Sequence, residues 1–441
     1  MSPRAYVVGD LHLGAGPGDP LEDFFDDDVF ARFCERIADP DTTLILNGDI
    51  IDFAQIAPFD TPKQAYLLWP EPASLQKLEV ALAAHAGFFA GLRTFLARGG
   101  HVRFIVGNHD LDMVWPKVQV RMWQALGEPP PERLAYDMGA HRFHGVHVEH
   151  GFEFTPENCP RDPRAFCYPG PDGQLYLERV WGTDFMLQFY NQLEREHPYA
   201  DNVKPMMTVA WHGLRKGWIG GRAVVRMLLF LKGRLGQPGV STLPWAGLAG
   251  AALAEPPPLT PAAAANAFDD PAWRQAVLDR ARAEPAAFKA ELDAAVAELE
   301  RDERHVATAP KKVEAVDPRA GGDGAGGTGA AGGASLGLFR EDRELRAARD
   351  RLAQPGVTHV VFGHTHSVVD GELDGQLFNY GTWLPSLDLA SPHVREKIAR
   401  DGITLELLKD HRLYKVDRRV VRIDADPRYA AKVRLVTDDA P

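Results

Sequence analysis

Short apolar runs rich in valine, isoleucine and leucine alternate with longer amphipathic stretches over the first 150 residues. The spacing of the apolar positions predicts strands in the runs and helices in the stretches between them. The predicted strands cover residues 5–8, 42–46, 102–106 and 145–150. The predicted helices cover residues 28–37 and 74–98, the second with Leu75, Leu78, Leu82 and Phe89 near one face. This repetition predicts βαβ units and a sheet covered by helices, an α/β fold.

The pattern changes near residue 159. Helices are predicted beyond it, at residues 178–196, 220–235 and 271–304, followed by a Gly/Ala-rich linker at about 320–338. Then come a charged helix and four strands, at residues 340–352, 358–362, 377–380, 412–416 and 420–423. The chain therefore divides into a first core part, a mainly helical insertion and a second core part with C-terminal strands, at residues 1–158, 159–339 and 340–441.

Polar motifs follow the predicted strands directly. They are Gly-Asp-Leu-His at 9–12, Gly-Asp-Ile-Ile-Asp at 48–52, Gly-Asn-His-Asp at 107–110, His-Gly at 150–151 and Gly-His-Thr-His at 363–366. In open α/β sheets, ligands gather at the carboxyl ends of strands. Carboxylate oxygens and imidazole nitrogens bind divalent metals. We therefore predict a two-metal site whose ligands are Asp10, His12, Asp49, Asn108, His150, His364 and His366.

Such a site predicts hydrolysis at phosphorus. Two ions about 3.5–4 Å apart, with Asp49 as the bridging ligand, would lower the pKa of a bound water to about 7, and the resulting hydroxide would attack phosphorus. His109 is placed to protonate the leaving oxygen or to stabilise the transition state. Asp110 is expected to hold that imidazole in the correct tautomer. Asp52 either orients a ligand or caps the next segment.

In this order, the five motifs resemble those of the calcineurin-like metallophosphoesterases: D-x-H, G-D-x-x-D, G-N-H-[DE], a single His, and G-H-x-H. The resemblance covers residues 4–154 and 358–387. It implies a four-layer α-β-β-α sandwich, here with a large insertion. It also implies a binuclear centre holding manganese as the leading candidate, or iron, zinc, magnesium or cobalt. The expected substrate is a phosphodiester, pyrophosphate or phosphomonoester.

Departures from the family pattern narrow the branch. Purple acid phosphatases carry a tyrosine ligand after the second motif, where this chain has Ile50 and Ile51. The motif around Asp49 and the Glu149-His150-Gly151 triplet look most like the UDP-2,3-diacylglucosamine hydrolases, which cleave a lipid-linked pyrophosphate. Those enzymes are shorter and typically carry arginine in place of His109, so their substrate is not transferred. A nuclease of the same fold and a metal-binding scaffold without turnover are the alternatives.

Two further segments carry open interpretations. Histidines recur every three residues at His141, His144, His147 and His150. Strand alternation would place His144 and His150 on one face and His147 on the other. Only His150 precedes the expected glycine, so we assign the other three to the surface or to packing. Residues 379–383, Asn-Tyr-Gly-Thr-Trp, are equally consistent with a place against the site and with the core.

Composition limits the partners and the compartment. Hydrophobic residues make up 45% and charged residues 25% of the chain, as in soluble globular proteins. Lys and Arg total 49 against 61 Asp and Glu, and the net charge of −12 argues against nucleic acid as the main partner. Cys34, Cys159 and Cys167 form neither a zinc-binding nor a disulfide pattern. With no signal-peptide pattern at its start, the chain is expected to be cytoplasmic.

Residues 211–235 combine Arg and Lys with large apolar side chains. A helix of this kind is expected either to pack as a cap over the site or to lie on an anionic membrane as a peripheral contact. We favour the cap. The insertion as a whole is then expected to select the substrate, a small-molecule or lipid-linked phosphate.

Overall fold

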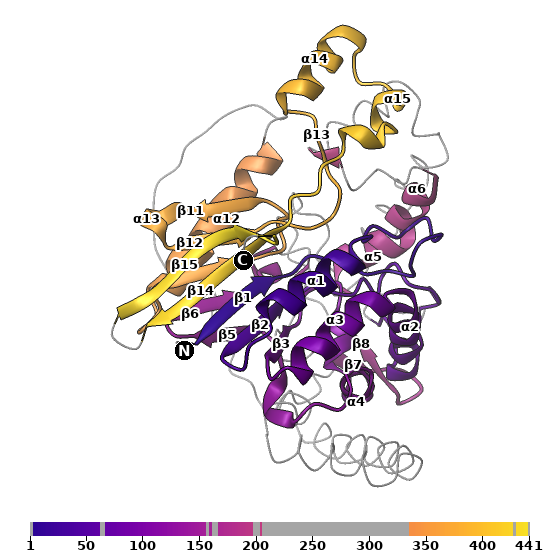
Figure 1. Ribbon diagram of the computed structural model, residues 1–441. Helices are drawn as coiled ribbons and strands as arrows, with labels where there is room; N and C mark the ends of the chain where they lie inside the picture. The colour runs from indigo at the N-terminus through magenta and orange to yellow at the C-terminus, as the bar shows by residue number, and fades with distance from the viewer. Residues whose placement is uncertain are drawn as a thin grey trace, which may run out of the picture.

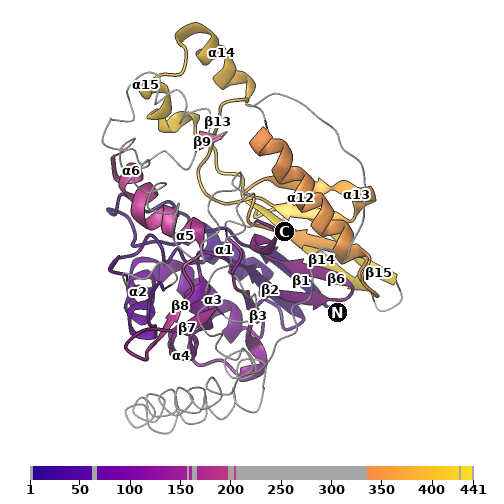
Figure 2. The same ribbon diagram turned by 180° about the vertical axis from the view of Figure 1, so that it is seen from behind.

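The computed structural model describes residues 3–61, 67–155, 158–160, 166–196, 203–204, 335–426 and 429–439. Two β-sheets lie face to face and carry helices on their outer sides (Figures 1 and 2). The helices predicted at residues 220–235 and 271–304 and the candidate membrane segment at 211–235 lie outside these ranges. The linker predicted at about 320–338 also lies outside them up to residue 334, whereas residues 335–338 belong to the helix α12 (Ser335–Leu352) and not to a linker.

The first sheet has six strands in the order β15-β14-β1-β2-β3-β4. Their bounds are β1 (Arg4–Val8), β2 (Thr42–Asn47), β3 (His101–Ile105), β4 (Leu134–Asp137), β14 (Arg419–Asp426) and β15 (Tyr429–Thr437). Strands β1 to β4 pair in parallel, β14 pairs antiparallel to β1, and β15 pairs antiparallel to β14 at the edge of the sheet. The parallel arrangement brings the carboxyl ends of β1, β2 and β3 to one edge.

The second sheet has five strands in the order β11-β12-β10-β6-β5. They are β5 (Ala140–Phe143), β6 (Val146–Glu149), β10 (His359–Phe362), β11 (Val368–Gly371) and β12 (Leu377–Tyr380). Strands β6, β10 and β12 are parallel neighbours. Because β10 lies beside β6, the chain beyond the insertion returns next to the strand that precedes it. Two short pairs are β7 (Cys167–Pro169) with β8 (Leu175–Leu177), and β9 (Val203–Lys204) with β13 (Leu387–Asp388).

The helices fall into groups along the chain. Those of the first part are α1 (Asp27–Ile37), α2 (Glu71–Ala84), α3 (Ala86–Ala97) and α4 (Pro116–Ala125). Next come α5 (Trp181–Phe185), the π-helical η4 (Met186–Tyr190) and α6 (Asn191–Glu196). The last part carries α12 (Ser335–Leu352), α13 (Glu372–Gly375), α14 (Pro392–Asp401) and α15 (Leu405–Leu408). Short 3₁₀ turns are η1 (Leu111–Val114), η2 (Pro131–Arg133), η3 (Phe152–Phe154) and η5 (His411–Leu413).

Strand alternation separates the first sheet into two apolar faces. One face, with Tyr6, Val8 and Leu44, packs with residues of α1 to α4 in one core cluster. The opposite face packs against the second sheet in another cluster, which contains Ala5, Val7, Ile45, Ile105, Val146, Val148, Val361 and Phe378. The outer face of the second sheet packs against α12 through Val360, Phe362, Leu377, Ala347 and Ala348. These layers form the expected α-β-β-α sandwich.

Two predictions about individual elements were wrong. The single helix predicted over residues 74–98 is two helices, α2 and α3, bent by 87° at His85. Both ring nitrogens of His85 face carboxylates, with Nε2 3.1 Å from Glu22 and Nδ1 3.0 Å from Asp27. This tie holds the chain at the bend. The strand predicted at residues 412–416 is instead the 3₁₀ turn η5 followed by an isolated bridge at Lys415.

A small separate cluster joins the insertion to the C-terminal part. Leu387 of β13 pairs beside Val203 of β9, and both pack with Val394, Ile403 and Leu407 from α14, α15 and the loop between them. Figures 1 and 2 both show α14 and α15 at the end of the molecule where α5 and α6 lie. No single helix in the described ranges meets the length and apolarity needed to cross a bilayer; α2 and α3 meet them together, but only as the bent pair.

Candidate metal centre

The loops that carry the predicted ligands have an unusual backbone. Asp10, His12, Asp49, His364 and His366 all have positive φ, between 50° and 66°. For residues other than glycine, this left-handed region costs about 1–2 kcal/mol each. Such strain persists only where surrounding contacts enforce it, and it clusters at functional sites. In the described ranges, five of the nine non-glycine residues with positive φ are residues that the motifs nominate as ligands.

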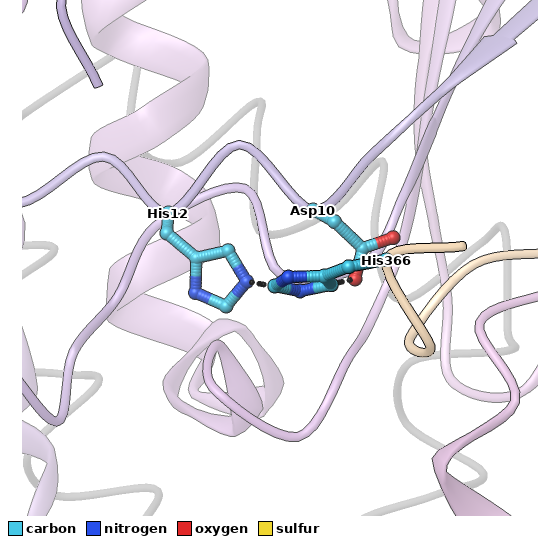
Figure 3. A group of neighbouring side chains, drawn as sticks. All are labelled: Asp10, His12 and His366. Atoms are coloured by element: carbon cyan, nitrogen blue, oxygen red, sulfur yellow. Dashed lines mark hydrogen bonds and ion pairs between the residues drawn. The ribbon is translucent and has the colours of Figure 1, made fainter. Parts of the chain in front are cut away.

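The first group of candidate ligands consists of Asp10, His12 and His366 (Figure 3). His12 Nε2 lies 3.1 Å from His366 Nε2, which lies 3.4 Å from Asp10 Oδ1. Two imidazole nitrogens and a carboxylate oxygen thus converge from the loops after β1 and β10. The Asp10 carboxylate also accepts the His364 backbone N–H at 3.0 Å, which joins the first and last motifs.

Asp52 orients His12. Its Oδ2 lies 3.0 Å from His12 Nδ1 and accepts the proton there, so His12 Nε2 carries the lone pair that faces His366. The other carboxylate oxygen of Asp52 accepts the Gln55 backbone N–H at 3.1 Å. Asp52 therefore does both things that the sequence left open: it orients a candidate ligand and it caps the following turn.

The second group consists of Asp49, His150 and His364, all buried. His150 Nδ1 donates to the Asn47 carbonyl at 2.8 Å, which directs Nε2 toward Asp49 Oδ2, 3.1 Å away. His364 Nε2 lies 2.9 Å from Thr155 Oγ1, whose hydroxyl donates to Phe152 O. The imidazole therefore donates to Thr155, and Nδ1 is the His364 nitrogen that carries the lone pair.

Asp49 lies between the two groups. Its Oδ2 is 3.1 Å from His150 Nε2 and 3.9 Å from His12 Nε2, and its Oδ1 accepts the His109 backbone N–H at 2.8 Å. Burial alone would raise the pKa of Asp49, but His150, His109 and His12 hold the pKa well below its usual range. The carboxylate is ionised and placed to bridge two ions.

Two buried atoms test whether this set fits metal ions. Within the described ranges, Asn108 Oδ1 is buried and has no hydrogen-bond partner, and the buried His150 Nε2 faces a carboxylate oxygen of another candidate ligand, Asp49, at 3.1 Å. A buried polar atom without a partner is costly, and binding of a cation would satisfy it. An amide oxygen, carboxylates and imidazoles with their second nitrogen or oxygen already engaged form a suitable donor set for divalent metals.

The structure corrects the expected partner of His109. Its Nδ1 lies 2.6 Å from Asp52 Oδ2, so Asp52 rather than Asp110 holds the imidazole. The Asp110 carboxylate instead accepts the backbone N–H groups of Ile50 and Gly107, at 2.8 and 2.5 Å. Asp110 thereby ties the second motif to the third. The sequence suggested Asp110 because it is adjacent to His109. In the structure, however, the Asp110 side chain turns back to the backbone, and the more distant Asp52 reaches the imidazole.

The charge on His109 follows from its surroundings. Burial lowers its pKa, but Asp52 and Asp49 more than offset this and raise the pKa to about 9. The ring is therefore an imidazolium at neutral pH. Because Nδ1 is committed to Asp52, the Nε2–H is the group that can be donated.

Of the four regularly spaced histidines, His150 is the one that belongs to the second group of candidate ligands. His147 is buried with Nε2 2.7 Å from Glu149, and His141 lies 3.4 Å from Asp137. His144 lies in the turn between β5 and β6 with φ of 48°, outside the strand. The expectation that His144 shares a strand face with His150 was therefore wrong, whereas its assignment away from the site fits the structure.

The segment at residues 379–382 belongs to the centre and was left undecided by the sequence. Asn379 Nδ2 donates to Gly363 O at 3.0 Å, and Thr382 Oγ1 donates to Asp10 O at 2.6 Å. Tyr380 donates to Asn47 O at 2.9 Å. A run of polar and aromatic side chains at the carboxyl end of a strand, close to where the five motifs begin, was the available signal.

The comparisons agree with this geometry. The family model for calcineurin-like phosphoesterases matches residues 3–235, more than half of the chain. That match includes Asp10, Asp49 and His150 but ends before His364 and His366, which the fold brings to the same centre. Among curated proteins there is no significant match. Members of the family typically bind two divalent metal ions and hydrolyse phosphoesters. The chain belongs to the calcineurin-like phosphoesterase family.

Proposed function

We propose that the chain is a two-metal phosphoesterase that acts on a phosphodiester, pyrophosphate or phosphomonoester. The observation that carries this proposal is the placement of Asp49 between two groups of ligands, with the imidazolium of His109 beside them. Six donors in the two groups, drawn from both sheets, together with the buried amide oxygen of Asn108, favour catalysis over a vestigial site. A scaffold without turnover would not need an acid positioned next to the ligands.

The chain's own residues account for binding and proton transfer. When bound, two divalent ions supply a hydroxide nucleophile near neutral pH and neutralise charge on the phosphoryl oxygens. Asp49 would be the ligand shared by the two ions, and Asp52 keeps His12 in the tautomer that can ligate. His109 donates its Nε2 proton to the leaving oxygen, while Asp52 stabilises the charged ring before transfer.

Substrate choice is assigned to the insertion. Its first helices touch the loop after the second motif: Gln55 Nε2 donates to Glu194 Oε2 at 2.9 Å, and Asn191 Nδ2 donates to Ala54 O at 2.8 Å. The insertion thus borders the centre. We infer a small-molecule or lipid-linked phosphate as substrate, with manganese as the leading metal. A cytoplasmic location, with or without a membrane contact through residues 211–235, stays a prediction.

Hydrolysis of bis(p-nitrophenyl) phosphate by the full chain with added Mn²⁺ tests the proposal. We expect metal-dependent turnover in the wild type and a loss of at least about 100-fold in Asp49→Asn, since that change removes the shared charged ligand. Asp424→Asn is the matched control, because Asp424 pairs in register with Arg4 at the opposite end of β1. Equal rates in Asp49→Asn and the wild type would refute the proposal.

A panel of substrates separates the alternatives. Phosphomonoesters, diesters, nucleotide sugars and nucleotide-linked lipids are compared with several metals. Activity on UDP-diacylglucosamine would assign the chain to the branch of the UDP-2,3-diacylglucosamine hydrolases. Degradation of DNA under conditions where all small esters are inert would identify a nuclease. Binding of two ions without turnover of any substrate would identify a scaffold.

A further inference from the structure

Tyr380 lies at the point where the two ligand groups meet the ends of β1, β2 and β10. The side chain is fully buried. A Cβ atom placed on Gly9 or on Gly363 would overlap its hydroxyl oxygen, and at Gly363 it would also overlap the Asp10 carboxylate. The glycines that open the first and last motifs therefore leave room for this phenol. The hydroxyl and the Asp10 carboxylate occupy neighbouring positions.

The same hydroxyl is coupled to the second group of ligands. It donates to the Asn47 carbonyl at 2.9 Å, and that carbonyl also accepts His150 Nδ1–H at 2.8 Å. One backbone oxygen thus holds both the phenol and the candidate ligand His150. A shift of Asn47 O would turn the imidazole whose Nε2 faces Asp49. Such outer contacts fix the orientation of metal ligands.

The neighbours of Tyr380 strengthen its position. Thr382 Oγ1 donates to Asp10 O at 2.6 Å and accepts the Leu384 N–H at 3.1 Å. Asn379 Nδ2 donates to Gly363 O, and its Oδ1 accepts the Gly381 N–H at 2.9 Å. Residues 379–382 therefore contact the backbone of the first and last motifs and of Asn47, the residue directly before the second motif. The tyrosine lies in the middle of this segment.

We propose that Tyr380 is a positioning residue that sets the separation of the two metal subsites. Its hydroxyl lies beside the Asp10 carboxylate of the first group and, through Asn47 O, is joined to His150 of the second group. This inference rests on the proposed two-metal centre, but it does not depend on turnover or on the identity of the substrate.

The test compares Tyr380→Phe, which removes only the hydroxyl, with Tyr136→Phe. Tyr136 is a buried tyrosine of β4 whose hydroxyl donates to Gln119 O, so it controls for losing a buried phenol. Mn²⁺ affinity and stoichiometry are measured by calorimetry, and the coupling between two bound Mn²⁺ ions by electron paramagnetic resonance. Unfolding of each metal-free protein is followed in urea.

We expect Tyr380→Phe to bind Mn²⁺ about tenfold or more weakly, with an altered or lost coupling signal. Its metal-free stability should change no more than that of Tyr136→Phe, and Thr382→Val should weaken Mn²⁺ binding in the same direction. Wild-type Mn²⁺ affinity and coupling in Tyr380→Phe would overturn the inference, as would a loss fully matched by lower metal-free stability. A wild type that binds two ions without hydrolysing any ester would contradict only the proposed function.

Discussion

At the scale of the residue, Asp52 controls two imidazoles with one oxygen. Its Oδ2 accepts from His12 Nδ1 at 3.0 Å and from His109 Nδ1 at 2.6 Å. Burial would raise the pKa of Asp52, but these two histidines hold the pKa below its usual range. The carboxylate stays charged, so it raises the pKa of His109 in return. One carboxylate thus keeps the proposed acid, His109, protonated and orients the candidate metal ligand His12.

Replacing Asp52 by asparagine should move the alkaline limit of activity to lower pH. The acid works only while His109 is protonated, and the carboxylate raises the pKa of His109. Losing an opposite charge at this distance lowers a pKa by about 1–3 units. The pH profile of kcat with an alkyl phosphate ester measures the shift. An ester with a p-nitrophenolate leaving group needs no acid and is the control; an unshifted limit on the alkyl ester would contradict this role.

The motifs predicted which residues meet at the centre, because each motif follows a strand and the strands are parallel. They did not predict how the side chains pair. Asp110 and Asp52 are equally plausible partners of His109 in sequence, and only the turn at residues 107–110, which points Asp110 at Gly107 N, decides between them. The place of Tyr380 could not be predicted either, because it depends on which strand lies beside β10.

At the scale of the element, the joint between α2 and α3 depends on a buried charge. The apolar period runs through residues 74–98 without a proline and continues past Gly87 and Gly91, so the sequence predicts one helix. The bend of 87° arises because His85 is held by Glu22 and Asp27 from the loop after β1 and from α1. Glu22 also accepts the Gly14 and Phe24 N–H groups. Long-range pairing of this kind leaves no local signal.

The free energy of unfolding should depend on pH through the protonation of His85. Burial lowers its pKa, but Asp27 and Glu22 more than offset this and raise the pKa to about 9, above the value of about 6.5 expected when unfolded. The stabilisation is therefore complete below about pH 6.5 and is lost as the pH rises through about 9. We expect His85→Gln to lower the free energy of unfolding by about 2 kcal/mol more at pH 6 than at pH 10, measured with urea.

His141→Gln is the control with the opposite sign. Burial and Arg103 lower the pKa of His141 to about 4, so it is neutral in the folded chain and its protonation favours unfolding below about pH 6.5. Between pH 7 and 10 its substitution should leave the pH dependence unchanged. If the free energies of unfolding of His85→Gln and the wild type differed by the same amount from pH 6 to 10, the ion pairs of His85 would not stabilise the bend between α2 and α3.

At the scale of the whole molecule, the centre joins two sheets that come from distant parts of the chain. Asp10, His12 and Asp49 follow strands of the first sheet, whereas His150, His364 and His366 follow strands of the second. The sequence predicted the sandwich and the split of its core. It did not predict β15. That strand is defined in the structure by its antiparallel pairing with β14. Bound metal would hold the two sheets together at one edge.

Metal should therefore stabilise the whole fold, and it should do so through ligands of both sheets. At about 100 times its dissociation constant, Mn²⁺ is expected to raise the free energy of unfolding by about 2.7 kcal/mol for each site, relative to protein in EDTA. His364→Asn should remove much of this increment. His144→Asn is matched to it, because both histidines have positive φ, which asparagine tolerates, but His144 lies in the β5–β6 turn. The control should keep the full increment in urea unfolding. An increment that survives in His364→Asn, or that falls equally in both variants, would mean that metal does not link the sheets through this residue.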